Sequence, residues 1–222
     1  KKLILILRKL NLKEGDNILV FADLLKFSLN INQNIKETSE ILFHSLKNVI
    51  GEKGTIVVPT YTPSVARYGR DFCYETTKSE VGFFSEYIRK NSLSFRSIHP
   101  INSFTAIGPK AEIICSKNSI NNFGIYSPLN KLHKIGSKIL SIGLPAAYCL
   151  GVAHYIEAMF CVPYIYNKIL ECNVLKNGRK IEKNYTASVR YLHLETNLEY
   201  TKWLNILFNN NKIKGCFMEK EK

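Results

Sequence analysis

Two titratable residues, His154 and Glu157, stand three positions apart in a segment with helical character. On a helix this spacing puts both side chains on one face, where the carboxylate can accept a hydrogen bond from one ring nitrogen. The other nitrogen is then free to act as a base. Acyl transfer to an amine needs such a base, because an alkyl ammonium must lose a proton before it attacks a thioester. The spacing also fits a histidine packed in a helix beside a solvated glutamate, and from spacing alone that arrangement is the commoner one.

Two other kinds of chemistry are open to the same histidine. Histidine and glutamate both bind zinc, but no third ligand and no H-E-x-x-H motif accompany them, so we expect no metal. A cysteine nucleophile is a minor alternative, since Cys149 lies near His154 in the chain. The six cysteines form no C-x-x-C pair, and we interpret them as reduced thiols.

A second polar cluster, H-P-I-N-S at residues 99–103, occupies a turn-rich stretch. The hydroxyl of Ser103 could donate to a thioester carbonyl or to a cofactor amide. An ordinary turn hydrogen bond is the commoner role for such a serine. A nucleophilic serine is disfavoured, because no G-x-S-x-G motif surrounds this residue.

A strand, a helix and a second strand in the first third of the chain would position these residues. The apolar run 17–22 is typical of a strand buried on both faces, and 54–60 reads the same way. Between them the pattern predicts a helix over 35–50, with Asn34 as its cap and Gly51 as its stop. This order favours parallel strands with a right-handed crossover. The loops after both strands should therefore meet at one sheet edge, where α/β proteins bind ligands.

The rest of the chain gives weaker signals. Residues 61–80 have no clear period and predict a surface loop, and 97–108 is rich in turn residues. Beyond residue 171, short alternating runs predict antiparallel strands, with Asn177-Gly178 as a hairpin turn. The remaining predicted elements are helices over 1–12, 81–91 and 198–208, a strand over 138–145, and a short helix that begins near Gly151 or Val152.

Composition indicates one soluble globular domain over residues 1–222. Hydrophobic residues make up 45% of the chain and charged residues 22%. No apolar stretch reaches membrane-spanning length and the first apolar run is too short for a signal peptide, so we expect a cytoplasmic protein without a membrane partner. The net charge is +13. Because the lysines are dispersed and no recognition motif accompanies them, we expect no nucleic-acid partner.

Several short motifs follow one another in an order that resembles the aminoglycoside 3-N-acetyltransferase family. The resemblance covers roughly residues 14–170. Its parts are D-L at 23–24, G-T-I-V-V-P-T-Y-T at 54–62, R-S-I-H-P-I-N-S at 96–103, A-I-G-P-K-A at 106–111, S-P-L at 127–129, Gly143, and H-Y-I-E at 154–157. Each piece is short, and their joint order makes the resemblance specific.

The resemblance implies an α/β fold, a three-layer α/β/α arrangement with a mixed, partly parallel sheet plus antiparallel C-terminal strands. It implies acetyl-CoA as co-substrate and an amino group on a sugar as acceptor, with direct transfer between them. His154 would be the general base and Glu157 would hold and polarise it. Cofactor contacts would come from Asp23, Leu24, Lys26 and Ser103, and substrate contacts from Tyr61, Arg96 and His99. A homodimer is compatible with the resemblance.

Three departures from the family pattern bear on the substrate. Phe21 and Ala22 replace a His and a Ser at the first strand end, a Gly-Gly pair is missing from residues 30–34, and the tail after Glu171 does not resemble the resistance enzymes. The chain holds 18 acidic residues against 31 Lys plus Arg. A basic cleft suits a nucleotide-linked amino sugar for surface polysaccharide synthesis, which is our first hypothesis. The alternatives are an aminoglycoside resistance enzyme and a catalytically idle protein that binds CoA or a nucleotide.

Overall fold

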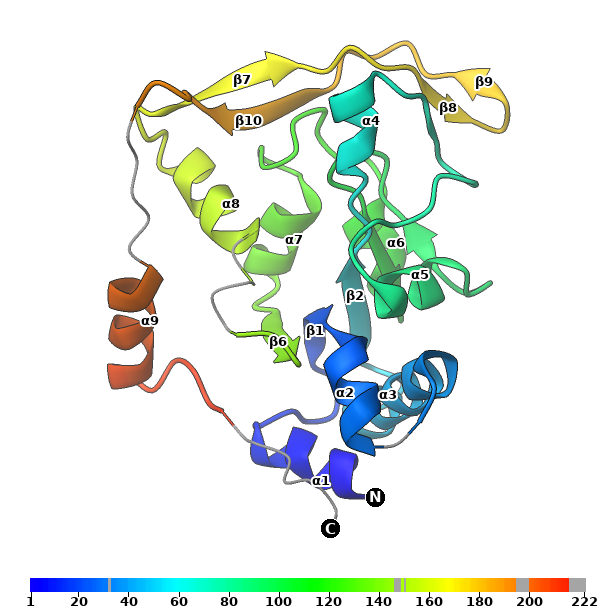
Figure 1. Ribbon diagram of the computed structural model, residues 1–222, viewed down its shortest axis with the longest axis vertical. Coiled ribbons are helices and arrows are strands. Elements are labelled where there is room, and N and C mark those ends of the chain that lie inside the picture. The colour runs from blue at the N-terminus through cyan, green and yellow to red at the C-terminus, as the bar shows by residue number, and fades with distance from the viewer. Residues whose placement is uncertain (32, 146–148, 150, 195–199, 216–222) are drawn as a thin grey trace.

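A five-stranded mixed sheet forms the centre of the protein (Figure 1). The computed structural model describes residues 1–31, 33–145, 149, 151–194 and 200–215. The strand order is β4-β5-β2-β1-β6, with β1 parallel to both β2 and β6, and β5 antiparallel to β2 and β4. The strands are β1 (Asn17–Ala22), β2 (Thr55–Pro59), β4 (Phe95–Arg96), β5 (Phe104–Ile107) and β6 (Lys138–Ile142).

Helices cover both faces of this sheet. Ile18 and Val20 of β1 belong to one apolar cluster, together with residues of helices α1, α2, α3 and α5. Leu19 and Phe21 point to the opposite face and pack in a second cluster with α6, α7 and α8. This alternation confirms the predicted three-layer α/β/α arrangement. The helices are α1 (Lys2–Lys9), α2 (Leu24–Ile31), α3 (Ile35–Ile50), α5 (Phe83–Arg89), α6 (Ala111–Cys115), α7 (Pro128–Lys134) and α8 (Gly151–Met159).

The long helix α3 has the bounds that its sequence predicts. The side chain of Asn34 accepts a hydrogen bond from the backbone nitrogen of Glu37 at 2.9 Å, and so satisfies a free donor of the first turn. Gly51 follows the helix with a φ of 65°, a conformation that favours glycine. Between them Leu42 and Leu46 are fully buried on the face that packs on the sheet.

Two smaller sheets lie along one end of the molecule, next to α4 (Pro63–Tyr68) and α8 (Figure 1). An antiparallel ribbon pairs β7 (Ile165–Ile169) with β10 (Thr186–Arg190). The other sheet joins β3 (Phe72–Cys73), β8 (Val174–Lys176) and β9 (Arg179–Lys180). Asn177 and Gly178 connect β8 to β9 with φ angles of 51° and 70°, which confirms the predicted hairpin turn.

Three expectations about local structure were wrong. The stretch 61–80, predicted as a surface loop, contains α4 and β3. The turn-rich stretch 97–108 contains β5, an inner strand of the central sheet. The junction after β1 opens directly into α2. The strands β3 and β5 are short and depend on distant partners, as β3 does on β8, and local pattern carries little of that information.

A last helix, α9 (Tyr200–Asn209), occupies the position predicted for the C-terminal helix. None of the helices in the described ranges combines the length and the apolar character that a membrane crossing requires.

Candidate active site

Helix α8 brings His154 and Glu157 together, one turn apart on the same face. The Nδ1 atom of His154 lies 2.8 Å from Oε2 of Glu157. The imidazole is 41% exposed, whereas the carboxylate side chain is only 10% exposed. Since the carboxylate accepts from Nδ1–H, Nε2 is the unprotonated nitrogen of the neutral ring, and it has no hydrogen-bond partner among the described residues. The pair has the arrangement of a base with its orienting acid.

Glu157 has two further partners on its other carboxylate oxygen. Arg190 donates from a terminal guanidinium nitrogen to Oε1 at 2.6 Å, and the hydroxyl of Tyr164 donates to the same oxygen at 3.1 Å. Burial raises the pKa of Glu157, but the hydrogen bond with His154, the charge of Arg190 and the Tyr164 hydroxyl together lower it below the ordinary value. The carboxylate is therefore ionised at neutral pH and can stabilise an imidazolium.

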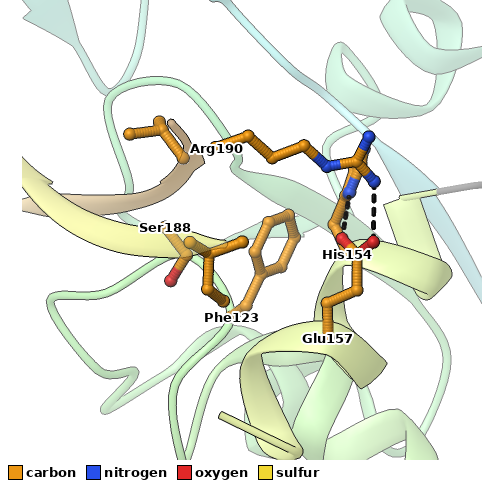
Figure 2. A pocket seen from close by; sticks show the side chains of 7 residues that line it. Phe123, His154, Glu157, Ser188 and Arg190 are labelled. Atoms are coloured by element: carbon orange, nitrogen blue, oxygen red, sulfur yellow. Dashed lines mark hydrogen bonds and ion pairs between the residues drawn. The ribbon is translucent and has the colours of Figure 1, made fainter. Parts of the chain in front are cut away.

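The dyad faces a cavity of about 370 Å³ between α8 and the β7–β10 ribbon (Figure 2). Figure 2 shows His154 and Glu157 on α8, Arg190 reaching toward them from β10, and Phe123 beside the imidazole. The ring centroids of Phe123 and His154 are 6.2 Å apart. The cavity is lined by Phe123, His154, Glu157, Ile165, Ser188, Val189 and Arg190. Within this lining, Glu157 is the one carboxylate and it is already paired with Arg190.

The predicted sheet edge also forms, at the carboxyl ends of β1, β2 and β6. Asp23 follows β1, and its side chain accepts from the backbone nitrogen of Leu25 at 3.1 Å in the first turn of α2. Gly143 follows β6 with a φ of 69°, and a Cβ on it would lie 2.5 Å from the carbonyl oxygen of Asp23. The close approach of these two loops requires glycine at this position.

Tyr61 extends this edge toward the dyad. Its hydroxyl is buried and has no hydrogen-bond partner among the described residues. A Cβ on Gly151, the first residue of α8, would lie 3.0 Å from that hydroxyl oxygen. Burial raises the pKa of Tyr61, so the group stays protonated and can donate. An orphan donor thus lies between the end of β2 and the helix that carries His154.

The other two residues predicted to contact a cofactor at this edge are less informative. Leu24 is 2% exposed and packs in the apolar core beneath α2 and α3. The side chain of Lys26 lies outside the described part of the structure.

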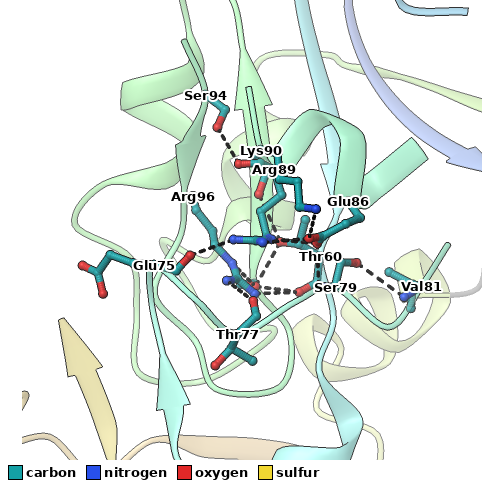
Figure 3. A network of polar contacts seen from close by, with 12 residues as sticks. Thr60, Glu75, Thr77, Ser79, Val81, Glu86, Arg89, Lys90, Ser94 and Arg96 are labelled. Atoms are coloured by element: carbon teal, nitrogen blue, oxygen red, sulfur yellow. Dashed lines mark hydrogen bonds and ion pairs between the residues drawn. The ribbon is translucent and has the colours of Figure 1, made fainter. Parts of the chain in front are cut away.

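Arg96 and Ser103 belong to one buried network. Figure 3 shows Arg96 in this network together with Thr60 and Thr77. Arg96 donates to the hydroxyl of Ser103 and to the carbonyl oxygens of Thr60, Tyr74 and Thr77, at distances of 2.7 to 3.3 Å. Ser103 in turn donates to the carbonyl oxygen of Thr60 at 2.8 Å. Desolvation lowers the pKa of Arg96 to about 10. Contacts of these side chains with ligands stay predictions. Within the fold, Arg96 links residues 74 and 77 to Thr60, the residue that follows β2.

His99 is 3% exposed and is also engaged within the protein. Its Nδ1 accepts from the backbone nitrogen of Asn102 at 3.1 Å, so Nε2 carries the proton and donates to the carbonyl oxygen of Thr186 at 3.1 Å. Burial lowers the pKa of His99 to about 4, which keeps the ring neutral. Both ring nitrogens are thus used within the protein, and the predicted contact of His99 with substrate stays a prediction.

Sequence reasoning missed two residues that complete the dyad, Arg190 and Tyr164. Arg190 lies in the alternating run that predicts β10, but no local spacing connects it to a glutamate 33 positions earlier. Tyr164 is seven positions beyond Glu157, in the connection between α8 and β7. Both contacts come from the chain turning back after α8, which periodicity does not reveal.

The two competing chemistries gain no support from the geometry. Burial raises the pKa of the Cys149 thiol, which disfavours the thiolate that a nucleophile needs. No group of three or more His, Cys, Asp or Glu side chains in the described ranges is placed to hold a metal ion.

Comparisons with known proteins agree with the fold. Residues 24–216 match the family model described as aminoglycoside 3-N-acetyltransferase. Aminoglycoside N(3)-acetyltransferase VII of Streptomyces paromomycinus is 27% identical over 165 residues, which cover 66% of this chain and 57% of that protein. Aminoglycoside N(3)-acetyltransferase III of a Salmonella species is 23% identical over 71% of this chain and 59% of its own length. The chain therefore spans less than two thirds of the length of these curated relatives.

Solved structures show the same fold at low sequence identity. A binary complex of AAC-IIIb with CoASH superposes with a TM-score of 0.76 at 19% identity, over 94% of this chain and 83% of that one. The crystal structure of AAC(3)-Xa gives 0.78 at 19% identity, over 95% of this chain and 81% of that one. Because the family model spans most of the sequence, the resemblance seen in its motifs is confirmed, and this chain belongs to the aminoglycoside 3-N-acetyltransferase family.

Proposed function

We propose that this protein is an acetyl-CoA-dependent N-acetyltransferase that acts on an amino group of a sugar. One observation carries the proposal: the free Nε2 of His154 is exposed to a cavity while its Nδ1 is held by an ionised, buried Glu157. This is the geometry of a general base that removes a proton from an incoming amine. Family membership supplies the reaction class, since the relatives are named for N-acetyl transfer.

The acetyl-CoA site would lie along the strand ends of β1, β2 and β6. The loops that follow β1 and β6 meet at this edge, and the orphan hydroxyl of Tyr61 beside Gly151 could donate to a ligand that passes there toward His154. When bound, acetyl-CoA supplies the acetyl thioester. The neighbour AAC-IIIb, which has the same fold, was solved with CoASH.

His154 would act by direct transfer, with both substrates bound. Its Nε2 takes a proton from the acceptor nitrogen as that nitrogen bonds to the thioester carbonyl carbon, and Glu157 stabilises the imidazolium that results. The carbon–sulfur bond then breaks, and the sulfur leaves as the CoA thiol after it takes the proton from the His154 imidazolium, which restores the neutral base. No group of the protein is acylated in this scheme.

The acceptor follows better from the comparisons than from the charge of the chain. The curated relatives are named as aminoglycoside N(3)-acetyltransferases, which favours an aminoglycoside over the nucleotide-linked sugar of our first hypothesis. An anionic amino sugar remains the second candidate because of one observation. The single carboxylate in the lining of the described cavity, Glu157, is paired with Arg190, and this leaves no free negative charge there for a polycation.

The test is an assay of thiol release from acetyl-CoA with two acceptors, a kanamycin-type aminoglycoside and a nucleotide-linked amino sugar. The His154→Ala variant should lower turnover by about 10²-fold or more and leave CoA binding nearly intact. His44→Ala, on the exposed side of α3, is the matched control and should keep full turnover. CoA binding without turnover of either acceptor would point to an idle homologue. A rate unchanged by His154→Ala would remove the proposed base.

A further inference from the structure

We infer that Arg190 is a positioning residue for the catalytic dyad, which fixes the Glu157 carboxylate so that His154 keeps its Nε2 turned to the cavity. The inference rests on the proposed function, because it assigns a role within the same site. Arg190 reaches the dyad through Glu157, and its ion pair with that carboxylate is the shortest contact the carboxylate makes.

The two carboxylate oxygens of Glu157 have different hydrogen-bond partners. Oε2 is used by His154, whereas Oε1 receives Arg190 at 2.6 Å and Tyr164 at 3.1 Å. Rotation of the carboxylate away from the imidazole would break both contacts on Oε1 at the same time. A carboxylate held on both oxygens keeps the ring in one tautomer and one orientation, as outer partners of a catalytic histidine do.

Arg190 is itself held by the ribbon and by an aromatic ring. It is the last residue of β10 and pairs with Ile165, the first residue of β7, so its backbone is fixed next to Tyr164. The guanidinium carbon lies 5.8 Å from the centre of the Tyr164 ring. One terminal nitrogen makes the contact with Glu157, while the buried Nε has no hydrogen-bond partner among the described residues. A single N–O contact carries the pairing, and a lysine could supply one as well.

The charge of Arg190 should also set the pH at which the dyad loses activity. The charged and titratable groups that face Glu157 are His154 on its own helix, Tyr164 after that helix and Arg190 on β10. Arg190 is the permanent cation among them. Without Arg190, the negative charge of the Glu157 carboxylate is no longer offset by a nearby positive charge, and the dyad then binds a proton more tightly. The acid limb of the rate profile should move to higher pH.

The experiment compares kcat/KM against pH for the wild-type protein and three variants, with acetyl-CoA and the best acceptor. Arg190→Gln should lower kcat/KM at pH 7 by about 10-fold or more and move the acid limb up by about one pH unit. Arg190→Lys keeps the charge and should leave the acid limb in place, with a smaller loss of rate. Lys168→Gln removes one positive charge from the neighbouring strand β7 and is the control that should change neither quantity.

A second readout does not depend on turnover. Histidine labelled with ¹⁵N should show the Nδ1 proton of His154 protected from exchange with water in the wild type and in Arg190→Lys, and exchanging faster in Arg190→Gln. If no acceptor is turned over, the proposed function fails while this readout still tests the inference. An Arg190→Gln protein with an unmoved acid limb and a protected Nδ1 proton would overturn the role given to Arg190.

Discussion

The Nε2 atom of His99 lies 3.1 Å from the carbonyl oxygen of Thr186, and this hydrogen bond ties the turn after β4 to the strand that carries Arg190. Thr186 is the first residue of β10 and Arg190 is the last. The ring of His99 also packs edge-on against Tyr185, with 5.7 Å between the ring centroids. A neutral, buried histidine thus anchors the ribbon that closes the candidate active site.

The burial of His99 predicts a stability that falls in mild acid. Its folded-state pKa of about 4 lies below the ordinary value of 6.5, so between these values the unfolded chain binds the proton more tightly. The contribution is therefore complete above pH 6.5 and is lost as pH falls toward 4. Between pH 7 and pH 5 this one residue should remove about 2 kcal/mol from the free energy of unfolding.

Denaturant unfolding at a series of pH values measures this effect. The His99→Gln variant cannot titrate at this position, so its stability should fall less steeply between pH 7 and pH 5 than that of the wild type. His44→Gln, at an exposed site on α3, should keep the wild-type slope. Equal slopes for wild type and His99→Gln would show that the ring is not buried as the structure has it.

Gly143 and Gly178 form a matched pair for testing the sheet edge. Both have a positive φ, 69° and 70°, so alanine should cost about 1 kcal/mol of backbone strain at either position. At Gly178 the added Cβ meets no atom within 4 Å, whereas at Gly143 it would lie 2.5 Å from the carbonyl oxygen of Asp23. Gly143→Ala should therefore lower the unfolding free energy by about 2 kcal/mol more than Gly178→Ala.

Binding of CoA provides the functional counterpart of that comparison. Gly143→Ala displaces the loops at which the acetyl-CoA site is proposed, and it should weaken CoA binding in calorimetry, while Gly178→Ala should not. Undiminished CoA affinity in a folded Gly143→Ala protein would move the proposed site away from this edge.

Arg96 is predicted to matter for stability. Arg96→Ala removes the donors that serve the carbonyl oxygens of Tyr74 and Thr77, and part-buried acceptors without partners are costly. The carbonyl oxygen of Thr60 also loses Arg96 and keeps the hydroxyl of Ser103 as its donor. We expect a loss of about 3 kcal/mol of unfolding free energy, measured by denaturant titration. Arg67→Ala, at an exposed position of α4, should change stability by less than about 0.5 kcal/mol. A loss for Arg96→Ala no larger than that of the control would contradict the network in Figure 3.

The sequence predicted the parts of the fold that local chemistry determines. The helix over 35–50 was found because its cap at Asn34, its stop at Gly51 and its apolar face all agree. The buried strands β1 and β2 were predicted from their continuous apolar runs, and the turn was predicted from the Asn177-Gly178 pair. The strands β3 and β5 were not predicted, since segments of two and four residues form strands only by pairing with distant partners.

The candidate site divides in the same way. His154 and Glu157 were predicted because both lie on one helix, where spacing determines contact. Arg190 was not, because the ribbon brings it to Glu157 from 33 residues away. The polar residues of the 96–103 motif were predicted as site residues from the family resemblance, but sequence alone could not tell whether Arg96 and His99 face a ligand or the protein interior. Burial decides that question, and it depends on the packed neighbours.

A double-mutant cycle tests whether Arg190 acts through Glu157 or independently of it. Glu157→Gln removes the charge that stabilises the imidazolium and should lower kcat by about 10²-fold. If Arg190 acts through Glu157, then adding Arg190→Gln to that variant should lower kcat only slightly further, because the contact it supports is already gone. If the two losses multiply instead, Arg190 acts on the acceptor or on the fold independently. The kcat values of wild type, both single variants and the double variant decide between these outcomes.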